Sequence, residues 1–444
     1  MMVIGHSLII AIIWQLLYFK GGEKMKRKIF LAIALLMVAS LVISACGGST
    51  PGTPSGSDGT GNATATPSAT PQSSSESPKP EFDGEIVIGS ILDLSGGMSA
   101  AGLATVWGAD YAVNEINEAG GINGKKLRII HYDVKGDPNE AINAYNRLVD
   151  QDKAVAVVGP GLSNIGIALA PITEEKKIPI VGHFMDERAT TNEQTGKKWN
   201  YMFLAEPSCN QQAEAIASYA VEKLGIKTVG ILFDSSNAYS VTHAEPFAAY
   251  CEAHGVKVVA TESFGKDAKD YKAQLSKIIA KNPDAIFVPA YVQQNALAYV
   301  QIRQLGYQGI VLGNNTYNNP FDSLIAGTSP DNLYFIFNVD YSSEYTKFLG
   351  DAYRAAKNEE PFINSAFGYD AVKIIANGLM HAEDMYSGES VAKAIEANTK
   401  NVMTSSGPIT INPETHRPEG MGVYIARWAS DMSKVELLEY YLAK

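Results

Sequence analysis

From residue 85 onward, short runs of β-branched residues alternate with segments whose apolar residues recur at helical spacing. The run 86–88 is the first predicted strand, and 106–118 the first predicted helix, which ends at Gly120 and Gly121, residues suited to a left-handed helix end. Further strands are predicted at 127–131, 154–158, 179–181, 229–233, 256–262, 285–288 and 310–312, and further helices near 141–150, 165–176, 212–224, 243–254, 271–281, 295–305 and 367–382.

This alternation of strand and helix predicts parallel sheets that are covered by helices on both faces. The 444 residues are too many for one ordinary core, so we expect two lobes or domains. The end of the chain is strand-like at 408–412 and 421–427, with a turn at 412–415 between them. The fold class expected from the pattern is α/β, with two such sheets.

The N-terminal part has the features of an export signal. Basic residues at 26–28 precede an apolar run, 29–43, that is too short to span a membrane comfortably and ends in small residues. The sequence 43–46 resembles the bacterial lipobox, whose cysteine, here Cys46, is lipidated after cleavage. We predict a signal peptide over 1–45 and an extracytoplasmic protein held at the cell membrane by a lipid. The apolar stretch 1–18 is either a second membrane segment or a start assigned too early, and we favour Met25 as the true start.

Residues 47–80 are almost all small, polar or proline, with no aliphatic side chain larger than alanine. Such a segment cannot bury enough surface to offset the entropy lost on ordering. We therefore predict a flexible linker over 46–83.

Composition excludes several classes of function. The net charge of -11 provides no positive field for phosphates and argues against nucleic-acid binding. The seven histidines are scattered singly, and the chain has no HExxH, GxSxG, dinucleotide-loop or Walker A sequence. We therefore predict no catalytic residues, no metal and no cofactor. Cys209 and Cys251 are expected to be small buried thiols.

The segment 108–125, GADYAVNEINEAGGINGK, resembles a signature of type I periplasmic binding proteins of the branched-chain amino acid (Leu/Ile/Val-binding) class. Matches at 132–133, 137–138, 158–163 and 267–271 extend the resemblance to about 85–428. It implies two Rossmann-like lobes joined by three hinge crossovers, with a ligand held between them. The implied crossovers lie near Ala205, Asn338 and Gly407, so the first lobe is 84–205 plus 339–406 and the second is 206–338 plus 407–444.

In such folds ligands lie at the carboxyl ends of the strands, beside the N-termini of helices. Ser163 follows a strand there and is either a ligand contact or a plain N-cap. Asp186 either pairs with an ammonium group or caps a turn, and Tyr239, Tyr291 and Tyr317 either cover a ligand or are surface aromatics. The predicted ligand-binding residues are Leu162, Ser163, Phe184, Met185, Asp186, Tyr239, Tyr291, Gln294 and Tyr317.

Members that bind amino acids hold the ammonium group with acidic residues at two positions. The matching positions here carry Cys209 and, in the second lobe, Gln293 and Gln294. Without charge-assisted partners, capture of an unmodified α-amino acid is in doubt. The resemblance implies a solute-binding lipoprotein of an ABC importer, with a small amino-acid-like or amide-like ligand and with the permease and ATPase as separate chains. The alternatives are a ligand-sensing receptor of the same fold that acts through a signalling partner and, as a third possibility, a hydrolase.

Overall fold

The computed structural model describes residues 80–318 and 320–442. The predicted signal peptide, Cys46 and all but the last residues of the predicted linker lie outside the described residues. Within the described part of the chain, no helix has both the length and the apolar character needed to cross a membrane.

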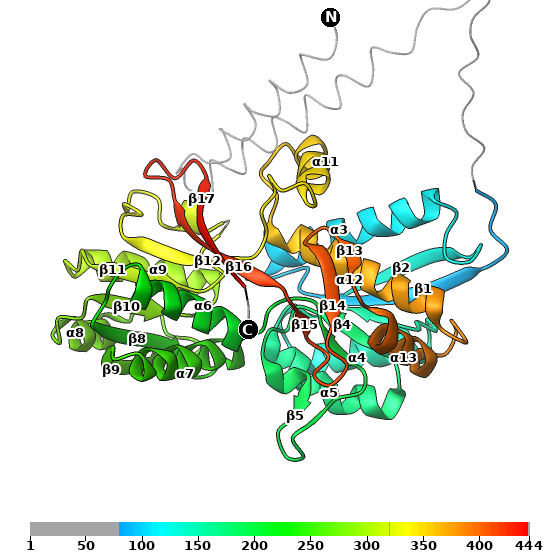
Figure 1. Ribbon diagram of the computed structural model, residues 1–444, viewed down its shortest axis with the longest axis horizontal. Helices are drawn as coiled ribbons and strands as arrows, with labels where there is room; N and C mark the ends of the chain where they lie inside the picture. Colours follow the sequence, from blue (N-terminus) through cyan, green and yellow to red (C-terminus); the bar gives the residue numbers. More distant parts are fainter. Residues whose placement is uncertain (1–79, 319, 443–444) are drawn as a thin grey trace, which may run out of the picture. The chain divides into compact units, whose positions relative to one another are not determined.

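The first lobe is built on a five-stranded parallel sheet in the order β2-β1-β3-β4-β7 (Figure 1). Its strands are β1 (Glu85–Leu92), β2 (Lys126–Asp133), β3 (Val157–Val158), β4 (Ile180–Gly182) and β7 (Met202–Leu204). One face is covered by α3 (Ser99–Glu118), α12 (Ile363–His381) and α13 (Gly388–Asn398), and the other by α4 (Pro138–Asp150) and α5 (Ser163–Lys176). A short η1 (Glu187–Ala189) and the pair β5 (Thr191–Asn192) and β6 (Lys197–Lys198) precede β7.

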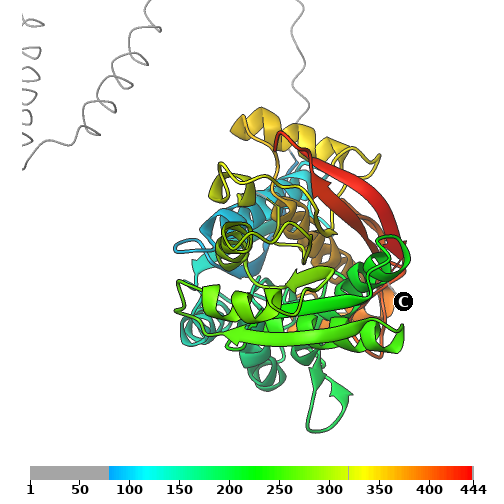
Figure 2. The same cartoon turned by 90° about the vertical axis from the view of Figure 1, so that its left-hand side faces the viewer.

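The second lobe contains a seven-stranded sheet in the order β17-β16-β12-β11-β10-β8-β9. Its strands are β8 (Thr228–Asp234), β9 (Lys257–Phe264), β10 (Ala285–Val288), β11 (Ile310–Gly313), β12 (Leu333–Phe337), β16 (Gly422–Trp428) and β17 (Val435–Leu442). Helices α6 (Cys209–Glu222) and α7 (Ala238–Ala253) cover one face, and α8 (Lys272–Ile279), α9 (Val292–Gln304) and α10 (Phe321–Leu324) the other. The last two strands run antiparallel, and Figure 2 shows this hairpin as a long curved ribbon beside the sheet.

The predicted alternation and the parallel sheets are confirmed, but several helices begin earlier than the pattern indicates. The helix predicted from residue 106 begins at Ser99, and the helix predicted from residue 243 begins at Ala238. The first turn of α3 reads Ser-Ala-Ala-Gly, which carries almost no hydrophobic periodicity. The pattern does not predict strand β17, because the apolar residues of VELLEYYL follow neither a strict alternation nor one continuous run, and its side chains are half-buried or exposed.

The third crossover lies later in the chain than the resemblance implies. Strand β14 (Gly407–Ile411) pairs with β13 (Val402–Thr404) and β15 (Pro418–Glu419), and the Leu204 N–H of β7 donates to the His416 carbonyl. These hydrogen bonds keep 407–419 with the first lobe. We therefore move the boundary from Gly407 to the stretch between β15 and β16, since the pairing of such short strands leaves no signal in the sequence.

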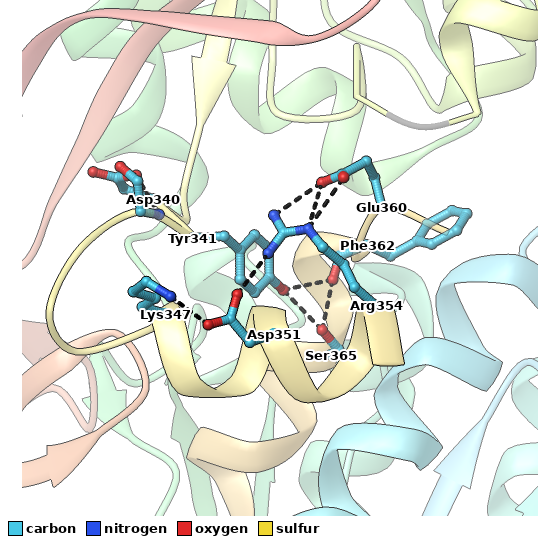
Figure 3. A network of polar contacts seen from close by, with 9 residues as sticks. Asp340, Tyr341, Lys347, Asp351, Arg354, Glu360, Phe362 and Ser365 are labelled. Atoms are coloured by element: carbon cyan, nitrogen blue, oxygen red, sulfur yellow. Dashed lines mark hydrogen bonds and ion pairs between the residues drawn. The ribbon is translucent and has the colours of Figure 1, made fainter. Parts of the chain in front are cut away.

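A half-buried tyrosine at the second crossover is hydrogen-bonded to the start of α12 (Figure 3). The Tyr341 hydroxyl donates to the Phe362 carbonyl at 2.7 Å and lies 2.8 Å from the Ser365 hydroxyl. Beside it, Arg354 of α11 (Lys347–Lys357) pairs with Glu360 at 2.9 Å. Such an exposed pair adds little stability, whereas the half-buried Tyr341 hydroxyl connects this crossover to the first turn of α12.

Candidate functional site

A cavity lies between the two lobes, at the ends of the strands where their helices begin. The first lobe contributes His183 and Met185, which follow β4, and Phe367 of α12. The second lobe contributes Tyr239 of α7, together with residues that follow β10 and β11. Residues of both lobes therefore share one cavity, as expected for ligands of open α/β sheets.

Two stacked aromatic pairs line this cavity, one from each lobe of the protein. Tyr239 and Tyr291 stack with ring centroids 4.9 Å apart and planes 8° apart. His183 and Phe367 stack at 4.9 Å and 30°. Burial raises the pKa of both tyrosines, so their hydroxyls stay neutral, and the Tyr239 hydroxyl donates to Asn315. These faces suit a planar or apolar part of a ligand.

Two polar side chains at the cavity are buried without a hydrogen-bond partner. The Ser163 hydroxyl, in a residue only 1% exposed, has none, and neither do the two ring nitrogens of His183, which is 3% exposed. Burial lowers the pKa of His183 to about 3, so the neutral ring offers one donor and one acceptor. An unpaired buried group costs about 1–3 kcal/mol, so these two side chains indicate the place where a ligand or a water would bind.

Asp186 is engaged within the protein. It is fully buried, caps η1 by accepting from the Arg188 N–H, and forms an ion pair of 2.6 Å with the Arg188 side chain. Thr242 of α7 adds a hydrogen bond of 2.5 Å from the other lobe. Asp186 does not line the cavity. Of the two predicted roles, the geometry supports the cap and replaces the ammonium contact with the Arg188 ion pair.

Four other predicted ligand residues also lie outside the cavity lining. Phe184 is fully buried in the first lobe, and Tyr317 is fully buried in the second, where its hydroxyl donates to the Val288 carbonyl at 3.1 Å. Leu162 packs against the core of the first lobe, and Gln294 lies in α9 without reaching the cavity. For Phe184, Leu162 and Tyr317 we replace the predicted ligand contact with a packing role. Of the predicted residues, Met185, Tyr239 and Tyr291 line the cavity, and Ser163 lies two residues after Gly161 of the lining.

Sequence reasoning missed part of the lining. Phe362, Asn364 and Phe367 belong to the first turns of α12, which the pattern predicts to begin only at residue 367. Asn315 belongs to a polar run that also fits an ordinary turn. Among the described residues, no group of three or more His, Cys, Asp or Glu side chains could hold a metal ion.

Cys209 lies at the start of α6 and is fully buried. Its N–H donates to the Met185 carbonyl at 2.7 Å, which places it close behind the cavity lining. Burial raises the pKa of the thiol well above its usual value, so the side chain is neutral. The position that carries an acid in amino-acid-binding members therefore supplies no charge here.

Comparisons with known proteins agree with this geometry. Residues 85–433 match the family model described as periplasmic binding protein. The chain is 28% identical over 359 residues to Leu/Ile/Val-binding protein homolog 3 of Brucella melitensis, covering 80% of this chain and 94% of that protein. It is also 28% identical to the leucine-, isoleucine-, valine-, threonine- and alanine-binding protein of Pseudomonas aeruginosa, covering 67% of this chain and 79% of that protein.

The fold also matches solved structures. The branched-chain amino acid transporter substrate-binding protein LivJ of Streptococcus pneumoniae, in complex with isoleucine, aligns with a TM-score of 0.71 at 28% identity, over 80% of this chain and 99% of that one. A leucine-binding protein of Thermotoga maritima aligns with a TM-score of 0.72 at 25% identity, over 80% and 99%. The chain therefore belongs to the periplasmic binding protein family, and it has the type I fold of the Leu/Ile/Val-binding proteins that it resembles.

Proposed function

We propose that this protein captures a small amino-acid-like or amide-like ligand between its lobes and delivers it to the permease of an ABC importer, whose ATPase and permease are separate chains. The main support for this proposal is the cavity shared by both lobes. Beside it, the Ser163 hydroxyl and the His183 ring are buried without hydrogen-bond partners. Ligand contacts made to both lobes favour the closed arrangement, which is the form that a permease distinguishes from the empty protein.

A thermal-shift screen of purified protein against amino acids, amides, ureas and short organic acids tests this proposal. A ligand that binds only the folded protein raises its stability by RT ln(1 + [L]/Kd). We expect at least one compound to raise the melting temperature in a concentration-dependent way and to remain chemically unchanged after incubation. Turnover of the bound compound, or no shift from any compound, would count against a capture role.

Replacing Ser163 by alanine is expected to weaken binding of the best compound about 10-fold, since a hydrogen bond from a buried hydroxyl is lost. The ligand-free variant should be as stable as the parent or slightly more stable, because an unpartnered buried hydroxyl has been removed. Titration calorimetry and urea unfolding measure the two effects separately. Ser218→Ala, on α6 outside the cavity lining, is the control, and an unchanged affinity in Ser163→Ala would refute this site assignment.

We further propose that Cys46 carries the lipid that holds the protein at the membrane, on the strength of the lipobox at 43–46. Mass spectrometry of the N-terminal peptide of the mature protein tests this, because it identifies both the first residue and any acyl groups. A mature peptide that still contains Trp14 would contradict the proposal.

A further inference from the structure

Five long helices begin at the cavity, and four of them are not capped by a side chain. The residues before helices α3, α5, α9 and α12 are Met98, Leu162, Tyr291 and Phe362, and no cap hydrogen bond is formed by any of them. Three of these residues line the cavity, as does Gly161, the neighbour of Leu162. The N-terminal N–H groups and positive dipole ends of four helices therefore lie at one place, where the Ser163 N–H of α5 already donates to the Tyr291 hydroxyl.

Helices that begin elsewhere mostly have the usual caps. Asp137, Ser208 and Ser387 accept backbone hydrogen bonds at the starts of α4, α6 and α13, whereas α8 and α11 lack such a cap. Helix α7 is the capped helix at the cavity, since Asn237 accepts from the Tyr239 N–H. An uncapped start leaves backbone donors for water or a ligand. The uncapped starts at the cavity thus provide donors where a ligand would lie, and the unpartnered Ser163 hydroxyl is the first side chain of one of these helices.

The cavity lining contains no Asp, Glu, Lys or Arg among the residues that the structure describes. Asp186 is held by Arg188, and Cys209 is a neutral thiol. Asp93, directly after β1, is an acid near Tyr291, and it accepts a hydrogen bond from the Gly136 N–H instead of lining the cavity. The positive ends of the helices are therefore not matched by a negative side chain that would bind an ammonium group.

We infer that the cavity selects a small carboxylate anion with a planar or apolar body and without an ammonium group, an inference that rests on the proposed capture function. The carboxylate would accept from the helix N–H groups and the Ser163 hydroxyl. Its body would lie against the two stacked aromatic pairs. A phosphate dianion fits less well, because no Lys or Arg of the lining supplies the second countercharge.

Two sets of matched probes test this inference in titration calorimetry with the mature protein. The sets are 4-methylpentanoate, leucine and 4-methylpentanamide, and 3-phenylpropanoate, phenylalanine and 3-phenylpropanamide. Within each set the body is the same while the ammonium or the negative charge is changed. In at least one set we expect the carboxylate to bind at least 10-fold more tightly than both the amino acid and the amide.

Isosteric charge variants test the electrostatic cause. Asn315→Asp and Asn364→Asp each place a carboxylate in the cavity lining, and the second does so in the first turn of α12, where an acid favours folding. Each should weaken carboxylate binding at least 10-fold more than it weakens amide binding. Asp93→Asn should leave carboxylate binding no weaker than in the parent.

The outcomes separate the two proposals. If leucine or phenylalanine binds more tightly than its carboxylate analogue, or if the amides bind best, the inference is overturned while the capture function stands. Loss of amino-acid binding in Asp93→Asn would also overturn it, by showing that Asp93 holds an ammonium group. If a compound of the broader screen binds but none of the six probes does, the inference is again overturned. If nothing binds, the capture function itself fails.

Discussion

Replacing Gly108 by alanine is expected to destabilise the folded protein by about 3 kcal/mol, near the upper end for overpacking a core. Gly108 lies in the middle of α3 where this helix crosses α12, and an added Cβ would lie 1.8 Å from the Ser365 carbonyl oxygen. Gly368 of α12 makes the reciprocal approach, since its Cβ would lie 2.0 Å from the Thr105 carbonyl. Both obstacles are backbone atoms, so no side-chain rotation relieves them.

The direction of the stability change in Gly108→Ala distinguishes two explanations. Helix propensity alone predicts that glycine to alanine inside a helix stabilises by about 1 kcal/mol. Urea unfolding of Gly108→Ala therefore distinguishes close helix packing from propensity by direction as well as by size. Gly265→Ala is the matched control, because an added Cβ there has no atom within 4 Å, and its effect should stay within about 0.5 kcal/mol.

A double variant makes the test sharper. Once Gly108→Ala has pushed the two helices apart, adding Gly368→Ala should cost less than it does alone, because both changes act on one contact. Additive effects, or a stabilised Gly108→Ala protein, would show that the helices do not approach in this way.

Gly108 also shows how much of the fold is present in the sequence. The strand and helix alternation follows from hydrophobic period, and the segment beginning at Gly108 indicates the family. The reason for glycine at that position is a contact with α12, more than two hundred residues later in the chain. Periodicity cannot show a contact of that range. The resemblance likewise placed the third crossover near Gly407, whereas pairing among β13, β14 and β15 decides the boundary.

The candidate site was predictable only in part. Ser163, Met185, Tyr239 and Tyr291 follow strands, and the topology brings the carboxyl ends of parallel strands together at one edge. Whether a side chain that follows a strand turns to the cavity or to the core depends on packing. Phe184 differs in this from its neighbours on both sides, since His183 and Met185 line the cavity while Phe184 fills the core.

The stability of the ligand-free protein is expected to fall by about 2 kcal/mol between pH 7.5 and pH 5 through His183 alone. The pKa of this buried ring is lowered to about 3 by desolvation, whereas an unfolded chain has a histidine pKa of about 6.5. Below about pH 6.5 the unfolded state therefore takes up a proton that the folded state does not. The contribution is fully present above pH 6.5 and is lost at about 1.4 kcal/mol per pH unit as the pH falls towards 3.

Replacement by neutral residues isolates this contribution from other buried groups. His243, whose pKa burial lowers to about 4, adds a loss of the same sign, whereas Asp93 and Asp370, whose pKa values burial raises to about 6, act in the opposite direction. The comparison is therefore the change in unfolding free energy between the two pH values, variant against parent. Between pH 7.5 and pH 5, His183→Phe and His183→Asn should each lose about 2 kcal/mol less unfolding free energy than the parent, whatever their stability at pH 7.5. The control, replacement of the exposed His254 by asparagine, should lose as much as the parent. If both His183 variants keep the full acid loss, the ring is not held neutral by burial, and an unseen partner must stabilise its charged form.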